Sequence, residues 1–244
     1  MDSAYNYYLI YNSLLSTPFR HEKRESFTKP ETVMRQMSPL DRLLVEIEHS
    51  LRTSLVKPPS DRPYPALDCT EEALDEHEMH HAAGLMRVNN AGEVAAQGLY
   101  RGQALLARDA AVQQRMLEAS AEENEHLNWC QTRLEQLGAR RSLLDPFWYW
   151  GSFAIGAAAA AVGDKWSLGF VEETEHQVTR HLESHLERLP TNDACSRKVV
   201  EQMKQDEIRH AEQARQAGAA PLPSPVRTAM SWVSRLMTAT AYRV

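Results

Sequence analysis

The chain has 244 residues, of which 43% are hydrophobic, 25% charged and 7% aromatic, a composition typical of a globular protein rich in helix. Its net charge of −6 argues against a nucleic-acid partner. The three cysteines, Cys69, Cys130 and Cys195, are far apart and no CxxC spacing occurs. We therefore expect neither a disulfide framework nor a thiolate zinc site, with a reducing compartment as the default.

The first 37 residues are predicted to form a disordered leader. The stretch 5–15 is mildly apolar, but no Lys or Arg precedes it and no small-residue cleavage site follows, so it does not resemble a targeting segment. Met34 and Met37 lie just ahead of the first capped helix. A second interpretation, in which translation begins at one of them, therefore stays open.

Residues 38–70 are predicted to form an amphipathic helix and a proline-rich linker. Ser38, Pro39 and Asp41 make a strong helix start, and the helix is expected to reach about residue 56. Its apolar face consists of Leu40, Leu43, Leu44, Ile47, Leu51 and Leu55. The prolines that follow predict a linker over 57–68.

Residues 71–244 are predicted to form a single all-α domain. Four long segments have helical periodicity, and Gly138, Pro190 and Gly218 end three of them. These segments are 71–108, 110–137, 165–189 and 194–217. A last amphipathic stretch covers 226–241, and no run alternates like a strand. The pattern predicts a four-helix bundle with flanking amphipathic helices.

An uncharged insert, 146–163, separates the second bundle segment from the third. It opens with four aromatic residues and continues with alanine and glycine, so it is only weakly hydrophobic for a bilayer span. One interpretation is a helix lying in the membrane interface, with the aromatic residues at the headgroups. The other is a crossover helix packed on the bundle. We favour membrane contact, and the basic, acid-free C-terminal stretch would lie on the same surface.

The chemistry is carried by Glu-x-x-His, which places a carboxylate and an imidazole one turn apart on one helix face. The motif occurs at 46/49, 78/81, 123/126, 173/176 and 207/210. Helical phase places Glu123 and Glu207 at the centres of apolar stripes, with His126 and His210 about 60° away. In the third segment the stripe centres on Glu175, about 60° from the alternative Glu172.

Adding Glu93 from the small-residue string NNAGEVAAQG makes a complete ligand set. The predicted metal ligands are Glu93, Glu123, His126, Glu175, Glu207 and His210. A Glu from each of two helices and Glu-x-x-His from two others is the ligand pattern of ferritin-like di-iron or di-manganese proteins. Four buried carboxylates would be neutralised by two divalent cations. The alternative is a metal-free core in which the histidines, Arg87 or Lys204 satisfy the acids.

Four segments carry a resemblance to a known family: 86–103 (MRVNNAGEVAAQGLYRGQ), 122–130 (EENEHLNWC), 169–186 (GFVEETEHQVTRHLESHL) and 203–214 (MKQDEIRHAEQA). They resemble the demethoxyubiquinone hydroxylases of ubiquinone biosynthesis, and the similarity runs from about residue 38 to the C-terminus. It implies a ferritin-like fold and the six ligands above, with Glu123 and Glu207 bridging two irons. The family's His six residues after the third-helix ligand fits Glu175 and His181.

Three further residues are candidates for lining the pocket or supporting the ligands. Tyr100 lies seven residues beyond Glu93 on the same helix face. His181 is more plausible as a support for a ligand than as a ligand. Asn90 stands where the family usually has histidine, so it can donate a hydrogen bond but cannot carry a proton.

The resemblance implies a monooxygenase that hydroxylates the ring of a polyprenyl methoxy-benzoquinol. Its cofactors would be two iron ions, with dioxygen as co-substrate and NADH or another reductant as electron source. Its partners would be the quinol, the membrane surface and other ubiquinone-biosynthesis proteins. The expected location is the cytoplasmic face of a bacterial cell membrane, or the mitochondrial inner membrane in a eukaryote. The alternatives are another ferritin-like iron or peroxide protein and a non-catalytic quinone-binding helical protein.

Overall fold

The computed structural model describes residues 38–70 and 72–244. The contacts divide the described residues between Leu44 and Val45 into two units, which we describe separately. The leader predicted for 1–37 lies outside the described residues. In the described part of the first unit, the Asp41 amide donates to Ser38 Oγ at 3.1 Å and the Ser38 amide donates to the Asp41 carboxylate at 2.9 Å. These bonds cap the helix start that the sequence predicts.

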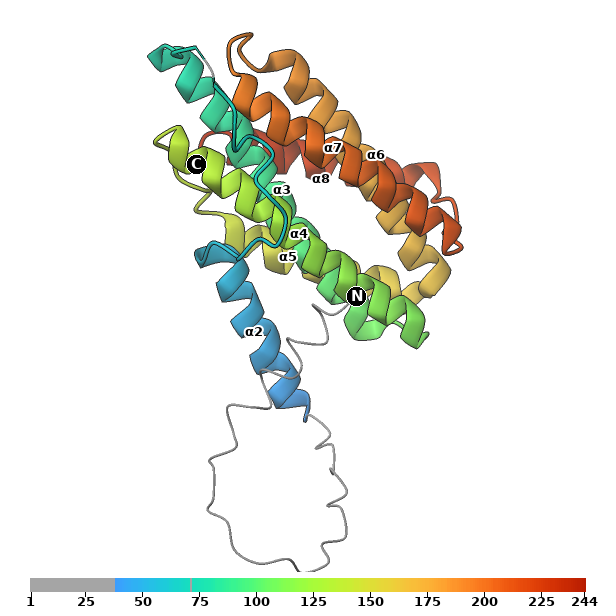
Figure 1. Cartoon of the computed structure of the whole chain (residues 1–244). Helices are drawn as coiled ribbons and strands as arrows, with labels where there is room; N and C mark the ends of the chain where they lie inside the picture. The colour runs from blue at the N-terminus through green and yellow to red at the C-terminus, as the bar shows by residue number, and fades with distance from the viewer. Residues whose placement is uncertain (1–37, 71) are drawn as a thin grey trace, which may run out of the picture. The chain divides into compact units, whose positions relative to one another are not determined.

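The described residues form seven helices and no strand (Figure 1). The helices are α2 (Pro39–Leu55), α3 (Glu76–Leu106), α4 (Ala110–Gln136), α5 (Asp145–Val162), α6 (Asp164–Arg188), α7 (Ala194–Gln216) and α8 (Ser224–Ala241). Two hairpins, α3–α4 and α6–α7, make the bundle of the second unit, since the helices of each pack along one another. The all-α prediction is confirmed for the part of the chain that the structure covers.

Helix boundaries follow the capping residues. Helix α3 begins at Glu76, five residues later than predicted, because the Asp75 carboxylate accepts from the Glu78 amide while the Glu78 carboxylate accepts from the Asp75 amide. Asp109 and Asp193 cap α4 and α7, each through a single side-chain hydrogen bond to a backbone amide. The helical periodicity of the sequence continues ahead of the capping residue Asp75, so the predicted start of this helix was wrong.

The uncharged insert forms α5 and packs along α3, its most extensive contact. Three glycines allow this, since a Cβ at Gly98, Gly102 or Gly156 would lie 2.1–2.2 Å from a backbone oxygen of the opposing helix. One face of α5 thus packs on the bundle, as predicted for a crossover helix. On its other face, Phe147 is 64% exposed. Among the described helices none is long and apolar enough to cross a membrane.

The bundle interior has two apolar layers. The first contains Leu85, Met86, Trp129, Leu134, Leu182, Val199 and Met203. The second contains Tyr100, Ala104, Val112, Met116, Leu168, Val171 and Ala214. On each of the four bundle helices, one predicted ligand Glu lies between a residue of the first layer and a residue of the second. The antiparallel hairpins therefore bring the four acids to one level of the bundle.

A disulfide joins Cys69, just before α3, to Cys195 at the start of α7, with the two Cα atoms 5.6 Å apart. The expectation that the cysteines would not pair was therefore wrong. The two positions are 126 residues apart, so sequence spacing contains no sign of their proximity. Cys130 is a free, buried thiol, as expected of a cysteine that serves as a small apolar residue.

Candidate metal centre

The six predicted ligands lie in the bundle interior, and none of the four carboxylates is more than 4% exposed. One ligand atom from each of Glu93, Glu123, His126 and Glu207 lies within 4.8 Å of the others. His210 borders this group through the same two carboxylates, Glu123 and Glu207. Helices α3, α4 and α7 thus contribute to one cluster.

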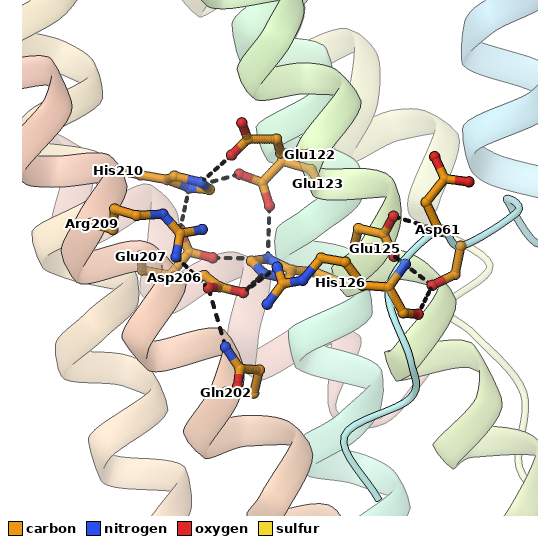
Figure 2. A network of polar contacts seen from close by, with 12 residues as sticks. Asp61, Glu122, Glu123, Glu125, His126, Gln202, Asp206, Glu207, Arg209 and His210 are labelled. Atoms are coloured by element: carbon orange, nitrogen blue, oxygen red, sulfur yellow. Dashed lines mark hydrogen bonds and ion pairs between the residues drawn. The ribbon is translucent and has the colours of Figure 1, made fainter. Parts of the chain in front are cut away.

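His126 points its Nδ1 atom into the cluster of acids (Figure 2). That atom lies 2.9 Å from Glu123, 3.1 Å from Glu207 and 3.7 Å from Glu93. Its other ring nitrogen, Nε2, donates to Asp206 at 3.1 Å. With the Nε2 proton held by Asp206, Nδ1 is the atom that would face a metal ion.

His210 repeats this arrangement from the opposite hairpin. Its Nδ1 lies 3.2 Å from Glu207 and 3.4 Å from Glu123, and its Nε2 donates to Glu122 at 2.9 Å. Both imidazoles therefore aim the same atom at the same pair of carboxylates.

Glu175 on α6 joins the cluster from the fourth helix. It is buried, and the Tyr100 hydroxyl donates a short hydrogen bond to its carboxylate. Burial, and next the nearby charges of Glu207 and Glu123, raise the pKa of Glu175 well above its usual value. The alternative Glu172 instead lies 3.8 Å from the half-exposed His176.

Burial and neighbouring charges set the pKa values of the other predicted ligands. Burial raises the pKa of Glu93 well above that of an ordinary glutamic acid. Burial opposes the charged form of His126, but the neighbouring carboxylates, Glu123 foremost, raise its pKa well above the usual range. Burial also works against ionised Glu123, yet the two imidazoles hold its pKa below normal. Without metal, protons on histidine and on some acids balance the remaining carboxylate charge.

The donor set fits a metal ion. Both carboxylate oxygens of Glu123, Oε1 of Glu207 and Nδ1 of His126 are buried and make no well-aligned hydrogen bond, although ion-pair distances join the imidazoles to the acids. Buried polar atoms without hydrogen bonds are costly, and a cation at their centre would satisfy them together. Carboxylate and imidazole donors without thiolate suit iron or manganese. In the metal-free alternative Arg87 would satisfy these acids, but it bonds to the carbonyl oxygens of Arg140 and Tyr242 instead.

Two acids of the site, Glu122 and Asp206, were missed by the sequence reasoning. Each directly precedes a ligand Glu, and each accepts from the Nε2 atom of the histidine on the opposing helix (Figure 2). The signal was present, because an acid, Glu, two residues and His occur in this order in both 122–126 and 206–210. The Glu-x-x-His motif does not include the position before its Glu, which is where both acids lie.

The three remaining Glu-x-x-His pairs have other roles. Glu46 pairs with Arg101, and His49 bonds to Gln97 at 3.1 Å, so both tie α2 to α3. The pair at 78/81 caps α3 and bonds to Tyr242. In the pair at 173/176, the acid bonds to Gln177 and the imidazole is half exposed.

The three supporting candidates lie in different surroundings. Tyr100 is fully buried and bonded to Glu175. The ring of His181 lies 3.9 Å from that of His185, and burial lowers the pKa of His181 to about 4. Asn90 donates to Asp145 at 3.2 Å, so its bond leads to α5 and not to a ligand.

A hollow of about 210 Å³ opens beside the cluster. It reaches Tyr100, His210 and Glu122 of the site just described. The hollow is otherwise lined by Arg115, Met116, Glu118, Ala119, Leu168, Val171, Gln213, Ala214 and Ala217. About half of its wall is apolar, and Arg115 and Glu118 are exposed charged residues of its lining, so an aromatic ring could pack against the apolar half.

Comparison with known proteins agrees with the geometry. Residues 80–241 match the family model described as ubiquinone biosynthesis protein COQ7. The chain belongs to this family. Its ferritin-like helical fold accounts for the two hairpins and for the buried Glu and His residues, so the predicted fold class and family resemblance are confirmed.

Several relatives in the family are named 3-demethoxyubiquinol 3-hydroxylase. The protein of Xanthomonas euvesicatoria pv. vesicatoria (strain 85-10) is 56% identical over 207 residues, covering 85% of this chain and 95% of the relative. That of Xanthomonas campestris pv. campestris (strain 8004) is 54% identical over 206 residues, covering 84% and 95%. The protein of Nitrosococcus oceani is 53% identical over 209 residues, covering 85% and 98%.

Proposed function

We propose that this protein is a di-iron monooxygenase that hydroxylates the ring of a polyprenyl methoxy-benzoquinol, converting demethoxyubiquinol to demethylubiquinol. The relatives that carry the hydroxylase name match this chain over nearly their whole length. The observation that carries the proposal is the buried cluster, in which two imidazoles aim Nδ1 at a shared pair of carboxylates.

The proposed ligands are Glu93, Glu123, His126, Glu175, Glu207 and His210. Glu123 and Glu207 would help to hold both ions, because each lies within reach of both imidazoles. Two bound iron ions would supply the redox chemistry that activates dioxygen. Four carboxylates and two divalent cations leave the interior electrically neutral.

The overall reaction consumes a reductant. One oxygen atom of dioxygen enters a ring C–H bond to make C–OH, and the other leaves as water with two electrons and two protons. We propose that NADH, or a partner that carries its electrons, supplies them. The chain has no GxGxxG loop to hold a nucleotide.

The chain's own residues position the substrate ring and exclude water. The hollow beside His210 is proposed to admit the ring, since its inner wall is made by small or apolar side chains such as Met116 and Ala119. The Tyr100 hydroxyl at the hollow holds Glu175 in place. Fixing a carboxylate in this way is what orients a ligand before a metal binds.

Membrane contact is proposed from the outer faces of α5 and α8. Phe147 on α5 and Trp232 on α8 are 64% and 66% exposed, and Val233 and Leu236 are also exposed. A polyprenyl tail leaves a bilayer only at a cost of about 0.8 kcal/mol for each buried CH₂ group, so the enzyme must come to the membrane. Because the relatives are bacterial, we place the protein on the cytoplasmic face of the cell membrane, beside other enzymes of the pathway.

Gene deletion with analysis of the extracted lipids tests the function. The deletion strain should accumulate the quinone that lacks one ring oxygen, and expression of the wild-type chain should restore ubiquinone. Expression of Glu207→Ala should not restore it, whereas expression of Glu173→Gln should. Glu173 belongs to a Glu-x-x-His pair, and it bonds to Gln177 and Arg180 and not to the cluster. Normal ubiquinone in the deletion strain would refute the proposed reaction.

A further inference from the structure

The linker ahead of the bundle is bound to α4 beside the metal centre. The Asn128 side chain donates to the Pro58 carbonyl oxygen at 2.6 Å. The backbone amides of Asp61 and Arg62 donate to the two oxygens of Glu125 at 2.9 and 3.3 Å, and the Ser60 hydroxyl bonds to the same carboxylate. We call residues 58–62 the strap. It lies outside the residues that match the family model.

The strap sends one side chain toward the centre. The Arg62 guanidinium lies 4.7 Å from the ring centroid of Trp129 and donates to Asp206 Oδ2 at 2.7 Å. Asp206 is fully buried, and the same Oδ2 atom accepts from His126 Nε2 at 3.1 Å. A three-residue chain therefore runs from the linker through Asp206 to His126, the imidazole that faces the acids.

The two oxygens of Asp206 are held by different partners. Arg209 and Gln202 donate to Oδ1 at 2.8 and 3.2 Å (Figure 2). Arg62 instead shares Oδ2 with His126. The position of Oδ2 decides which ring nitrogen of His126 keeps its proton and how the ring is turned. Arg62 is thus the cation best placed to fix the hydrogen-bond acceptor of His126.

We propose that Arg62 is a positioning residue for the metal centre, acting through Asp206 so that His126 presents Nδ1 to the metal. The inference rests on the proposed metal site and adds a role for the linker. It makes metal affinity depend on a segment that precedes the bundle in sequence. The partners that orient a metal ligand typically change metal affinity 10- to 100-fold when they are removed.

The test measures Co²⁺ binding to the full-length protein by competition with a chelating dye, without quinol or reductant. Arg62→Ala should weaken Co²⁺ affinity about ten-fold or more and change the visible ligand-field absorption of the bound ion. Arg62→Lys keeps the charge but not the planar stacking on Trp129, so it should recover part of the loss. The unfolding temperature of the metal-free variants separates a local effect from a loss of fold.

Two controls define the outcome. Lys57→Ala removes another linker cation, one that bonds to the exposed Glu135 at 2.7 Å, and should leave Co²⁺ affinity unchanged. Arg209→Ala removes an equal charge from the other oxygen of Asp206 and should have a smaller effect than Arg62→Ala. Wild-type affinity in Arg62→Ala, or an equal loss in Arg209→Ala, overturns the positioning role. A wild-type protein that binds no Co²⁺ overturns the metal site itself.

Discussion

The two histidine sides of the cluster are built alike but closed to different extents. On the His126 side, Asp206 is buried with a side chain 0% exposed, and Arg62, Arg209 and Gln202 all bond to it. On the His210 side, the corresponding acid, Glu122, is 52% exposed and borders the hollow. The repeated sequence pattern gives the same ligands twice, while the residues outside the pattern make one side rigid and the other accessible.

This difference suggests a division of labour. Because the Asp206 side is fixed by three partners, it is suited to hold ligand geometry before metal arrives. The Glu122 side has fewer constraints and an open wall, so it is suited to admit dioxygen and a ring. Substitutions can either remove a carboxylate that both sides share or change one side alone.

The largest effect is expected from the carboxylates that serve both sides. Glu123→Gln removes a charge that faces both imidazoles, so the protein should lose nearly all of its bound iron and its activity. Iron content after anaerobic loading measures this. Glu173→Gln is the matched control and should keep wild-type iron. Retention of two irons by Glu123→Gln would contradict the proposed role of Glu123 in holding both ions.

Next in size is the contrast between the two orienting acids. Asp206→Asn should lower metal affinity about 10- to 100-fold, since it weakens the acceptor of a buried imidazole proton. Glu122→Gln should lower it only a few-fold, because water can replace a half-exposed partner. Parallel Co²⁺ titrations of the two variants test this order. Equal losses would mean that the two sides are energetically equivalent.

A bulky residue in the hollow should hinder substrate entry on the Glu122 side without changing metal binding. Ala119→Phe should reduce kcat/KM for the quinol about ten-fold while iron content stays at the wild-type level. Ala121→Phe, an exposed position on the same helix, is the control for the added ring. Steady-state kinetics with a short-chain quinol measure the effect. Unchanged kinetics in Ala119→Phe would place the substrate route elsewhere.

The smallest expected effect is the release of protons when metal binds. Burial raises the pKa of Glu93 and Glu175, and the acids raise the pKa of both histidines, so each of these groups holds its proton more strongly than usual when metal is absent. Binding of divalent ions should therefore release protons. Metal affinity should rise with pH for the same reason. Calorimetry in buffers of different ionisation enthalpy counts the protons, and a value near zero would contradict these protonation states.

Much of this organisation follows from local sequence, and the rest depends on distant contacts. Helical phase predicted the inward acids, because burial on a helix repeats every three or four residues. Arg62 and the partner of Cys69 could not be predicted in this way, since each acts on a residue more than 100 positions away. The role of the insert was predicted in part. Its glycines were visible, but only the structure shows that Gly156 of the insert lies with Gly98 and Gly102 of α3 at the α3–α5 interface.

The glycine-mediated approach of α3 and α5 has a consequence for how the molecule opens. Backbones in such close contact cannot slide apart easily, whereas the contacts between the α3–α4 and α6–α7 hairpins are few. The slowest amide hydrogen exchange should therefore occur in α3 and α5. The two hairpins should separate first when the protein opens locally. Metal ions bound by both hairpins would hold them together and slow amide hydrogen exchange in α6 and α7.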